Sequence, residues 1–398
     1  MNLQDAHRIL QQVLAPMPLD AFLDETLGRR VAKVGGEAAA ERVRMLGDNP
    51  ERTILEAYGY FSPKLGYHAA EPSGPPPMIE PATDLEAFRA KIAAFHANGY
   101  TVRVPTLRWA SSALDQFCRA LECVLHQPVK AEAFWSRGDA KAPVHHDDYD
   151  IIVIQLKGRK RWFIAADPSD LPNAWKGIPD ANTLRIDNEQ VVEVGPGDLL
   201  YLPRGTKHRV DALADSLHIS IGFVPLTLRE AITAALDHFS DLERGLRVSV
   251  GDRLSAAVSR DDFADIAAQV RQGVAALAQL CASDDFIAEA MQRRSSRAIG
   301  DLDKLPPAGY RPSQITAELR VRHNPLALCH LSANAEKIDF SHPGGHIYIH
   351  RGAEEGVRFI AATPEFQVRD VPGAYGDDVR FALVGRFLDS GFLQAVGD

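Results

Sequence analysis

The chain has 398 residues, of which 45% are apolar and 24% charged, and its formal net charge is -9. These values are typical of a globular protein with two or three domains. The acidic balance argues against general affinity for nucleic acid and mildly favours a basic partner. The four cysteines form no Cys-x-x-Cys pair, so neither a disulfide framework nor a thiolate zinc site is indicated. The chain has no apolar run of about 18 residues and no signal-peptide pattern, so we expect no membrane segment and a cytoplasmic location.

The first third of the chain is predicted to be mainly helical. Apolar residues at helical spacing predict an amphipathic helix over residues 3–14, ended by Pro16 and Pro18. Further elements are predicted as a helix at 20–27, a loop at 71–83, a helix at 83–97, a strand at 100–104 and a helix at 109–126. For the helix at 83–97, Thr83 and Glu86 have the spacing of a capping box.

From residue 129 onward the apolar pattern changes to a period of two. The predicted strands are short and separated by Gly, Pro, Asn or Asp, and they cover residues 129–135, 150–156, 159–164, 183–186, 191–194, 199–202 and 217–224. Such a succession is typical of a β-sandwich or barrel. Because candidate metal ligands lie on two of these strands, we predict a double-stranded β-helix of the jelly-roll or cupin kind.

After residue 225 the pattern returns to helical. Thr227 and Glu230 form a second capping-box match, and helices are predicted over 261–280 and 284–294. We expect a helical bundle that packs against the barrel or against a second copy of the chain. Beyond a linker at 306–309, a helix at 314–319, strands at 338–340, 347–349 and 357–361 and a helix at 379–391 predict a small α+β domain, for which a winged helix is one arrangement. The predicted domains are therefore 1–225, 226–300 and 301–398.

Three residues have the character of a metal site. His145 and Asp147 stand two apart, so on a strand both would project from the same face while His146 points away. A third ligand, His208, ends the run Gly-Asp-x-x-Tyr-x-Pro-x-Gly-x-x-His that begins at Gly197. Two imidazoles and one carboxylate on one side of a metal are the arrangement of non-haem Fe(II) oxygenases.

A buried cation would be needed if the cosubstrate is 2-oxoglutarate, because its far carboxylate requires a positive partner. On the strand 159–164, Lys160 shares a face with the apolar Trp162 and Ile164. A lysine on an apolar face needs an anion to offset its desolvation. If the faces of the strand are reversed, Arg159 or Arg161 is the inward cation instead.

The run His145-x-Asp147-Asp-Tyr149, followed by Gly-x-Lys160-x-Trp, resembles the signature of the cupin-like JmjC oxygenases, specifically of the ribosomal oxygenase group. The resemblance continues through His208 and the run 216–220. It implies Fe(II) held by His145, Asp147 and His208, 2-oxoglutarate held by Lys160, and O₂ as the second cosubstrate. It also agrees with that group's order of barrel, helical dimerisation region and C-terminal winged helix, which implies a homodimer.

Members of that group usually carry Asn-x-Tyr ahead of the metal motif, and the matching positions here are Ala131 and Ala133. This departure predicts a differently shaped pocket, surrounded by Glu132, Phe134 and Trp135, although Trp135 could equally belong to the core.

Other polar residues near the motif have weaker signals. Tyr149 shares parity with Asp147 and is a candidate for the pocket wall, and Ser220, in the last matching run, is a candidate for contact with the cosubstrate. The facing of His218 is left open because a loop separates it from His208. The spaced histidines His342, His346 and His350 are interpreted as surface residues, since Pro and Gly interrupt any helix there.

The sequence thus predicts an Fe(II)- and 2-oxoglutarate-dependent oxygenase that hydroxylates a side chain in a protein, foremost a basic ribosomal protein. No membrane and no direct nucleic-acid partner is expected, because the terminal region is rich in acidic residues. One alternative keeps the same site with a ribosomally made biosynthetic peptide as substrate, for which the pocket at Ala131 and Ala133 is the motive. Another alternative is a non-catalytic cupin-like regulatory module whose metal is structural.

Overall fold

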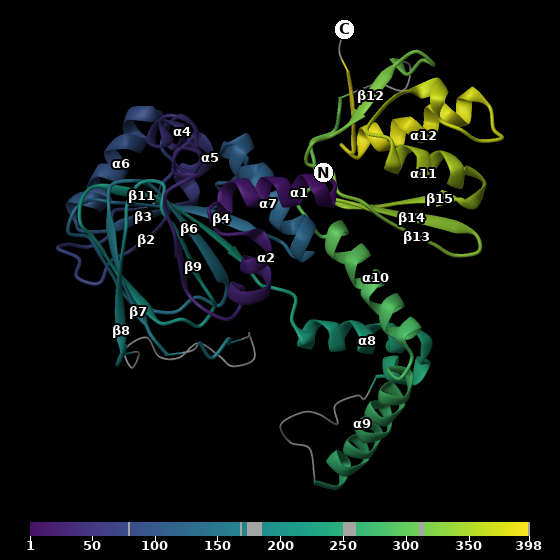
Figure 1. The fold of residues 1–398 in the computed structure, drawn as a ribbon, viewed down its shortest axis with the longest axis horizontal. Coiled ribbons are helices and arrows are strands. Elements are labelled where there is room, and N and C mark those ends of the chain that lie inside the picture. Colours follow the sequence, from purple (N-terminus) through teal and green to yellow (C-terminus); the bar gives the residue numbers. More distant parts are fainter. Residues whose placement is uncertain (79, 168, 173–184, 250–259, 310–313, 397–398) are drawn as a thin grey trace. The chain divides into compact units, whose positions relative to one another are not determined.

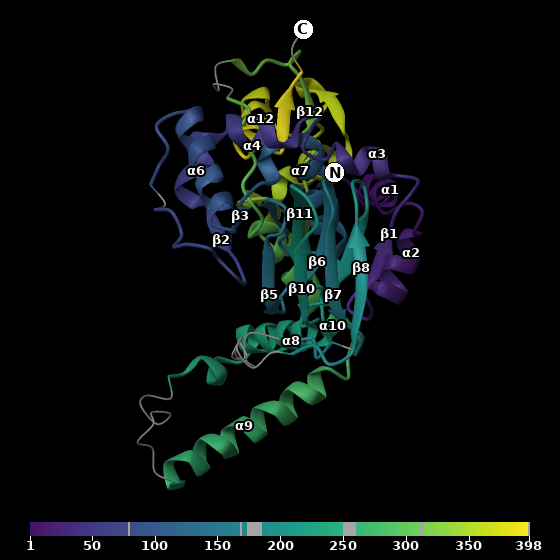
Figure 2. The ribbon, with the colours of Figure 1, turned by 90° about the vertical axis from the view of Figure 1, so that its left-hand side faces the viewer.

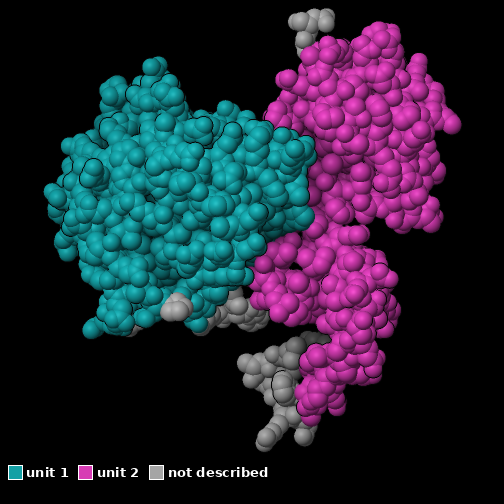
Figure 3. Space-filling model, in the orientation of Figure 1, with its two compact units in different colours: residues 1–225 teal, residues 226–398 magenta. Residues whose placement is uncertain are grey.

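The computed structural model describes residues 1–78, 80–167, 169–172, 185–249, 260–309 and 314–396. The chain divides into two compact units, Met1–Pro225 and Leu226–Asp398, which are coloured separately in Figure 3. Among the described residues, no helix is both long and apolar enough to cross a membrane.

The first unit contains two antiparallel sheets. The larger has seven strands in the order β1-β9-β6-β11-β4-β3-β2, and the smaller has four in the order β5-β10-β7-β8. The strands of the smaller sheet lie side by side in Figure 2. The strand bounds are β1 Ala32–Val34, β2 Gly66–His68, β3 Thr101–Val104, β4 Lys130–Ser136, β5 Lys141–His145, β6 Asp150–Lys157, β7 Lys160–Ala165, β8 Glu189–Val194, β9 Leu199–Leu202, β10 His208–Ala212 and β11 Ser216–Phe223.

Helices of the N-terminal part cover one face of the larger sheet (Figure 1). They are α1 Leu3–Leu14, α2 Leu19–Ala21, α3 Ala39–Val43, α4 Pro50–Glu56, α5 Tyr58–Phe61, α6 Leu85–Ala97 and α7 Ser112–Leu125, with short turns η1 Phe22–Thr26, η2 Ser62–Lys64 and η3 Arg108–Ala110. The core between helices and sheet includes Leu14, Phe95 and Leu121 on the helices and Ile154 and Ile219 on the strands. Burial of these apolar side chains fixes which face of each strand is left to form the cavity.

A second, smaller core lies between the two sheets. It contains Val153 and Leu200 of the larger sheet and Trp162, Ile164 and Val210 of the smaller one. Sheets that face each other and alternate their side chains between inside and outside make a jelly-roll of the predicted kind.

The second unit begins with helices α8 Leu228–Leu242 and, after η5 Arg244–Arg247, α9 Arg260–Leu280 and α10 Asp284–Gly300. The capping box of Thr227 and Glu230 at the start of α8 is present as predicted. Helix α10 contacts β13, β14 and β15, so the long helices and the terminal α+β region share one unit.

The terminal region holds two three-stranded antiparallel sheets, β16-β12-β17 and β13-β14-β15. Its elements are β12 Arg320–His323, β13 His330–Ala333, β14 Lys337–His342, β15 Gly345–His350, η7 Arg351–Ala353, α11 Glu354–Ala362, β16 Glu365–Gln367, η8 Val368–Asp370, α12 Asp377–Asp389 and β17 Leu393–Ala395.

Three predicted elements differ from the structure. Residues 357–361 were predicted to form a strand but lie in helix α11, where Gly356, Val357 and Ile360 are buried at helical spacing. The helix predicted at 314–319 is absent, because residues 314–319 contain only a 3₁₀ position and a turn before β12. The N-cap of α6 is Asp84, whose carboxylate accepts from the backbone N–H of Ala87, and the predicted Thr83 cap is therefore wrong. The strand predicted at 183–186 lies partly outside the described residues.

Candidate metal centre

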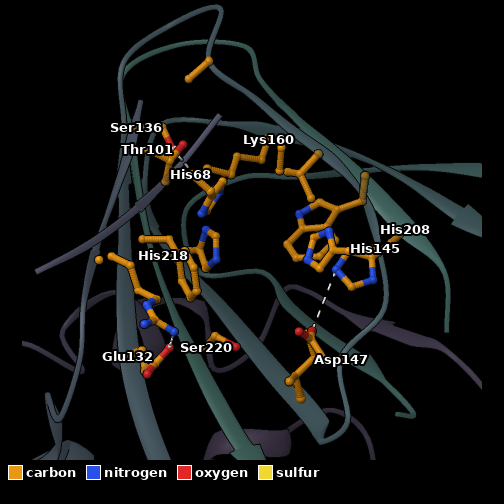
Figure 4. A pocket seen from close by; sticks show the side chains of 18 of the residues that line it. His68, Thr101, Glu132, Ser136, His145, Asp147, Lys160, His208, His218 and Ser220 are labelled. Atoms are coloured by element: carbon orange, nitrogen blue, oxygen red, sulfur yellow. Dashed lines mark hydrogen bonds and ion pairs between the residues drawn. The ribbon is translucent and has the colours of Figure 1, made fainter. Parts of the chain in front are cut away.

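A cavity of about 750 Å³ lies between the two sheets, and both sheets contribute its walls. Strands β2, β3, β4 and β11 of the larger sheet form one wall, and β5, β7 and β10 form the other. Figure 4 shows His145, Asp147 and His208 on one side of this cavity and Lys160 and Ser136 on another.

The three residues predicted to bind metal come together at the cavity wall. One potential ligand atom from each of His145, Asp147 and His208 lies within 4.8 Å of those of the other two, the only such cluster of three His, Cys, Asp or Glu among the described residues. The centroids of the two imidazole rings are 4.3 Å apart, and His208 Nε2 is 3.8 Å from Asp147 Oδ2. The β10–β5 pairing explains the approach, because His208 stands directly opposite His145 in that register.

The loop before β10 holds the cluster in place. The Gly205 N–H donates to the Asp147 carbonyl over 2.8 Å, which ties the turn after β5 to the turn before His208. The same loop is anchored by the buried Asp150 carboxylate, which accepts from the Arg204 N–H over 3.2 Å and from the Tyr201 hydroxyl. Positions 145, 147 and 208 are therefore fixed by backbone as well as by packing.

Hydrogen bonds fix the tautomer of both histidines. His145 Nδ1 lies 2.8 Å from the Pro143 carbonyl oxygen, and His208 Nδ1 lies 2.9 Å from that of Thr206. Because a carbonyl can only accept, each Nδ1 must carry the proton, which leaves the lone pair of Nε2 free for a metal. Burial, reinforced by the neighbouring His145, lowers the pKa of His208 to about 4, so its ring is neutral at pH 7. A neutral imidazole is the form that binds a metal ion, so the donor set fits a divalent cation.

Lys160 lies in the same cavity, completely buried, as the predicted alternation of β7 requires. Its Nζ donates to Ser136 Oγ over 2.9 Å, and burial lowers its pKa to about 7. Arg161, one residue on, points outward and pairs with the exposed Glu193. The reversed facing, with an arginine inside, is therefore excluded. A buried ammonium with one neutral partner is suited to an anionic ligand.

Two positions predicted to shape the cavity do not line it. Ala131 and Ala133 face the helical core, because even-numbered residues of β4 face the cavity. The wall is made instead by Glu132, Phe134 and Ser136, so the prediction that Ala131 and Ala133 give the pocket a different shape is wrong. Trp135 packs against the same helical core as the alanines, which decides the alternative left open for it.

The remaining candidates divide between cavity and surface. Tyr149 and Ser220 line the cavity, Tyr149 with 43% of its surface exposed. His146 does not line it and lies 4.0 Å from the Asp148 carboxylate. In the terminal region, His342 is buried, contrary to its interpretation as a surface residue, while His346 binds Asp339 over 2.9 Å.

The sequence predictions missed part of the cavity. His68 reaches it from β2 and Thr101 from β3, and neither belongs to a recognisable motif. His218, whose facing was left open, also points into it. For His218 the signal was available, because Leu217 and Ile219 are apolar and alternation turns the residue between them to the other face.

The site lies in a stretch of the chain that matches a known family model. Residues 107–231 match the model of the JmjC domain, and this stretch includes β4 to β11 with all three clustered residues. This stretch of the chain is therefore similar to the JmjC domain.

Individual proteins similar to this chain have more specific descriptions than the domain model. The chain is 28% identical over 214 residues to the ribosomal protein uL16 3-hydroxylase of Escherichia coli, covering 50% of this chain and 55% of that protein. It is 25% identical over 278 residues to the bifunctional lysine-specific demethylase and histidyl-hydroxylase of Drosophila persimilis, covering 64% of this chain. The match spans only 39% of the length of that fly protein.

Solved structures show the same fold over nearly the whole chain. The ribosomal oxygenase YcfD of Escherichia coli, in complex with cobalt and succinic acid, aligns with a TM-score of 0.56 at 17% identity. The alignment covers 96% of this chain and 99% of that one, so the fold beyond the JmjC domain is shared as well.

Proposed function

We propose that the chain is an Fe(II)- and 2-oxoglutarate-dependent oxygenase that hydroxylates an amino-acid side chain in a protein, foremost a ribosomal protein. The observation that carries the proposal is one cavity with two complementary ends. Two imidazoles and a carboxylate converge at one end, and a buried lysine lies at the other. The ribosomal substrate is proposed because the bacterial relative is a ribosomal protein hydroxylase.

Each residue has a defined part in this proposal. His145, Asp147 and His208 would hold Fe(II) on one side and leave about three positions for ligands. With Fe(II) bound, 2-oxoglutarate and O₂ supply the oxidising power, and one oxygen atom enters a C–H bond of the substrate while succinate and CO₂ are released. The Lys160 ammonium neutralises the carboxylate remote from the metal, and Ser136 orients that ammonium over 2.9 Å. The walls exclude water and hold the substrate C–H bond in position.

The open side of the cavity is suited to a side chain presented by a larger molecule. Tyr67 and Tyr149 line it with exposed fractions of 40% and 43%, and Lys130 lies over the Tyr149 ring at 5.6 Å. Tyr149 and Ser220 are proposed to contact substrate or cosubstrate from the larger sheet and the turn before it. A ribosomal substrate would place the activity in the cytoplasm.

The second unit is proposed to make a homodimer. Leu228, Ile232 and Leu236 follow one another at four-residue spacing on α8 and are 76%, 55% and 46% exposed. An apolar stripe of this kind on a helix is typical of a helix–helix interface. We assign dimerisation to residues 226–300 and a winged-helix-like arrangement to 301–398, with no direct role in binding nucleic acid.

The test is turnover with the purified protein. Anaerobically loaded with Fe(II) and then given O₂, 2-oxoglutarate and ribosomal proteins, the chain is expected to form succinate and to add 16 Da to one of them. His208→Ala should abolish both products while the fold, followed by circular dichroism, is retained. A protein that forms no succinate with any ribosomal protein or peptide, or whose His208→Ala variant is equally active, would contradict the proposal.

The two alternative functions are affected differently by the geometry of the cavity. The biosynthetic-peptide hypothesis loses its motive, because Ala131 and Ala133 do not line the cavity. The regulatory-module hypothesis predicts that His208→Ala lowers stability and removes no reaction, so the same experiment decides it.

A further inference from the structure

Two turns supply metal ligands, and one buried carboxylate contacts the chain beside both of them. The turn after β5 carries Asp147, and the turn before β10 leads into His208. Asp150, the first residue of β6, follows Asp147 by three positions. Its Oδ1 accepts from the backbone N–H and from Nη1 of Arg204, each over 3.2 Å. The Asp150 side chain therefore joins the strand that follows one ligand to the turn that precedes the other.

This carboxylate lies on the opposite face of the sheet from the cavity. Ile151 lines the cavity, so strand alternation turns Asp150 to the other face. On that face, Ile152 and Tyr201 belong to the core between the sheet and the helices. Asp150 is completely buried there and does not line the cavity. Any part that it has in the metal site must therefore act through the two turns.

Further hydrogen bonds surround the carboxylate and its arginine. Asp150 Oδ2 accepts from the Tyr201 hydroxyl, whose oxygen accepts in turn from the Gly28 N–H over 2.6 Å. Burial and the adjacent Asp150 carboxylate raise the pKa of Tyr201, so its hydroxyl remains a donor. Arg204 Nε donates to the Pro172 carbonyl over 3.1 Å. The network thus ties the metal-site turn to segments that are far apart in the sequence.

The turn that contains Arg204 is bonded to both ligand residues. The Gly205 N–H donates to the Asp147 carbonyl over 2.8 Å, and the Thr206 carbonyl oxygen lies 2.9 Å from His208 Nδ1. A displacement of Arg204 would carry its two neighbours with it. It would therefore change both the separation and the direction of the two ligand side chains.

A buried ion pair is a weak source of fold stability. Asp150 is 0% exposed and Arg204 is 8% exposed, so both charges have lost most of their contact with water. Replacing such a pair by uncharged side chains is often neutral or stabilising, whereas removing one partner leaves an uncompensated buried charge. Stability alone therefore gives little reason for this pair, and what it supplies is a fixed geometry of the two turns.

We propose that Asp150 is a positioning residue for the metal site, which acts with Arg204 to hold Asp147 and His208 at the separation that a divalent metal ion requires. The inference rests on the proposed function, because it concerns the metal centre on which that function depends. The apolar core is sufficient to stabilise this part of the fold, and the charged pair fixes the shape of the site.

The test measures Mn(II) binding and stability in the same variants. Asp150→Asn keeps the shape of the side chain but leaves the Arg204 charge without its partner, so it should lower both the urea midpoint and the affinity for Mn(II). Adding Arg204→Met removes that charge and should recover much of the stability. Altered orientation of metal ligands typically weakens binding, so the double variant should still bind Mn(II) roughly 10- to 100-fold more weakly than the wild type by isothermal titration calorimetry.

Cobalt reports the geometry of the site through the visible absorption of bound Co(II), which depends on the arrangement of its ligands. The spectrum of the double variant should differ from that of the wild type. Glu122→Gln is the matched control, because Glu122 is a carboxylate with 2% exposure that pairs with Arg108 and Arg119 and lies outside the cavity. It should lose stability as Asp150→Asn does, and keep the Mn(II) affinity and the Co(II) spectrum of the wild type.

The outcomes separate this inference from the function on which it rests. If the wild type binds Mn(II) and the double variant binds it equally well, with the same Co(II) spectrum, the positioning role is overturned and the metal site stands. The same holds if Glu122→Gln weakens Mn(II) as much as Asp150→Asn does, because affinity would then only follow stability. If the wild type binds no Mn(II), or if His208→Ala binds it unchanged, the proposed function fails and the inference fails with it.

Discussion

At the scale of single residues, the site depends on which nitrogen and which face each side chain presents. Both clustered histidines hold their Nδ1 against the carbonyl two residues earlier, at Pro143 and Thr206. A bond to the carbonyl two residues earlier needs no distant partner, so local backbone alone prepares Nε2 for the metal. Strand alternation similarly places Lys160 inside and Arg161 outside.

The buried Lys160 makes stability depend on pH in a way that can be measured. Its pKa is about 7 in the folded protein, against 10.5 for a free lysine. Between these values the unfolded chain binds more protons than the folded one, so the free energy of unfolding rises with pH through this window. Below about pH 7 the full cost of burying the charge is present.

Lys160→Met should therefore stabilise the ligand-free protein at pH 6, by up to about 5 kcal/mol, and the gain should shrink as pH rises toward 10. Urea unfolding at several pH values measures it. Lys157→Met, at an exposed lysine paired with Glu51, is the control and should show no such trend. A Lys160→Met variant that is less stable than the wild type at pH 6 would contradict the assignment of an uncompensated buried charge.

The sequence correctly predicted the residues that a motif or the alternation of a strand identifies. It did not predict the positions whose facing depends on the strand register. His145, Asp147 and His208 were predicted to converge, and the structure brings them together. The prediction for Ala131 and Ala133 was wrong because it assigned pocket positions from their place in the sequence alone. A shift of one residue in the strand register moves a side chain to the other face of the sheet. His68 was not recognisable because only the tertiary fold brings β2 to the cavity.

At the scale of elements, the turn between β6 and β7 decides where Lys160 lies. Gly158 has φ of +68° there, and a Cβ at this position would lie 2.0 Å from the carbonyl oxygen of Asp215. The backbone preceding β11 thus packs against the turn so closely that only glycine fits.

Gly158→Ala is accordingly expected to destabilise the protein by about 2–5 kcal/mol, through a left-handed alanine and a clash with backbone. Gly28→Ala isolates the first effect, because Gly28 has φ of +67° but nothing within 4 Å of its Cβ position. It should cost only about 1–2 kcal/mol. Equal losses in the two variants, measured by urea unfolding, would show that the close approach to Asp215 contributes nothing.

Elements with a clear hydrophobic period or a clear N-cap could be predicted from the sequence. Very short elements, and those whose pattern suits both helix and strand, could not. Helix α1 and the capping box of α8 follow the sequence signals. The β-branched and aromatic content of residues 357–361 favoured a strand, yet burial at positions 356, 357 and 360 follows a helix. Strands β1 and β2, of three residues each, are too short to have a period of their own.

At the scale of the whole molecule, the exposed apolar stripe on α8 is a feature that a single chain leaves unexplained. Leu228, Ile232 and Leu236 would cost free energy in water, and a second copy of the chain would bury them. The double variant Leu228→Glu with Ile232→Glu should be a monomer, whereas the wild type should be a dimer, by light scattering after size exclusion.

The control for this prediction is Val379→Glu, which places a charge at an exposed apolar residue of α12 and should leave the dimer intact. A wild type that is monomeric at micromolar concentration, or a double variant that stays dimeric, would remove α8 as the interface.

The most direct test of the whole account is a crystal structure with Mn(II) and 2-oxoglutarate, recorded without O₂, in which anomalous scattering locates the metal. One anomalous peak is predicted, about 2.0–2.3 Å from Nε2 of His145, Nε2 of His208 and a carboxylate oxygen of Asp147, with the remote carboxylate of 2-oxoglutarate against Lys160. A metal bound elsewhere, or a cosubstrate whose remote carboxylate lies away from Lys160, would contradict the account.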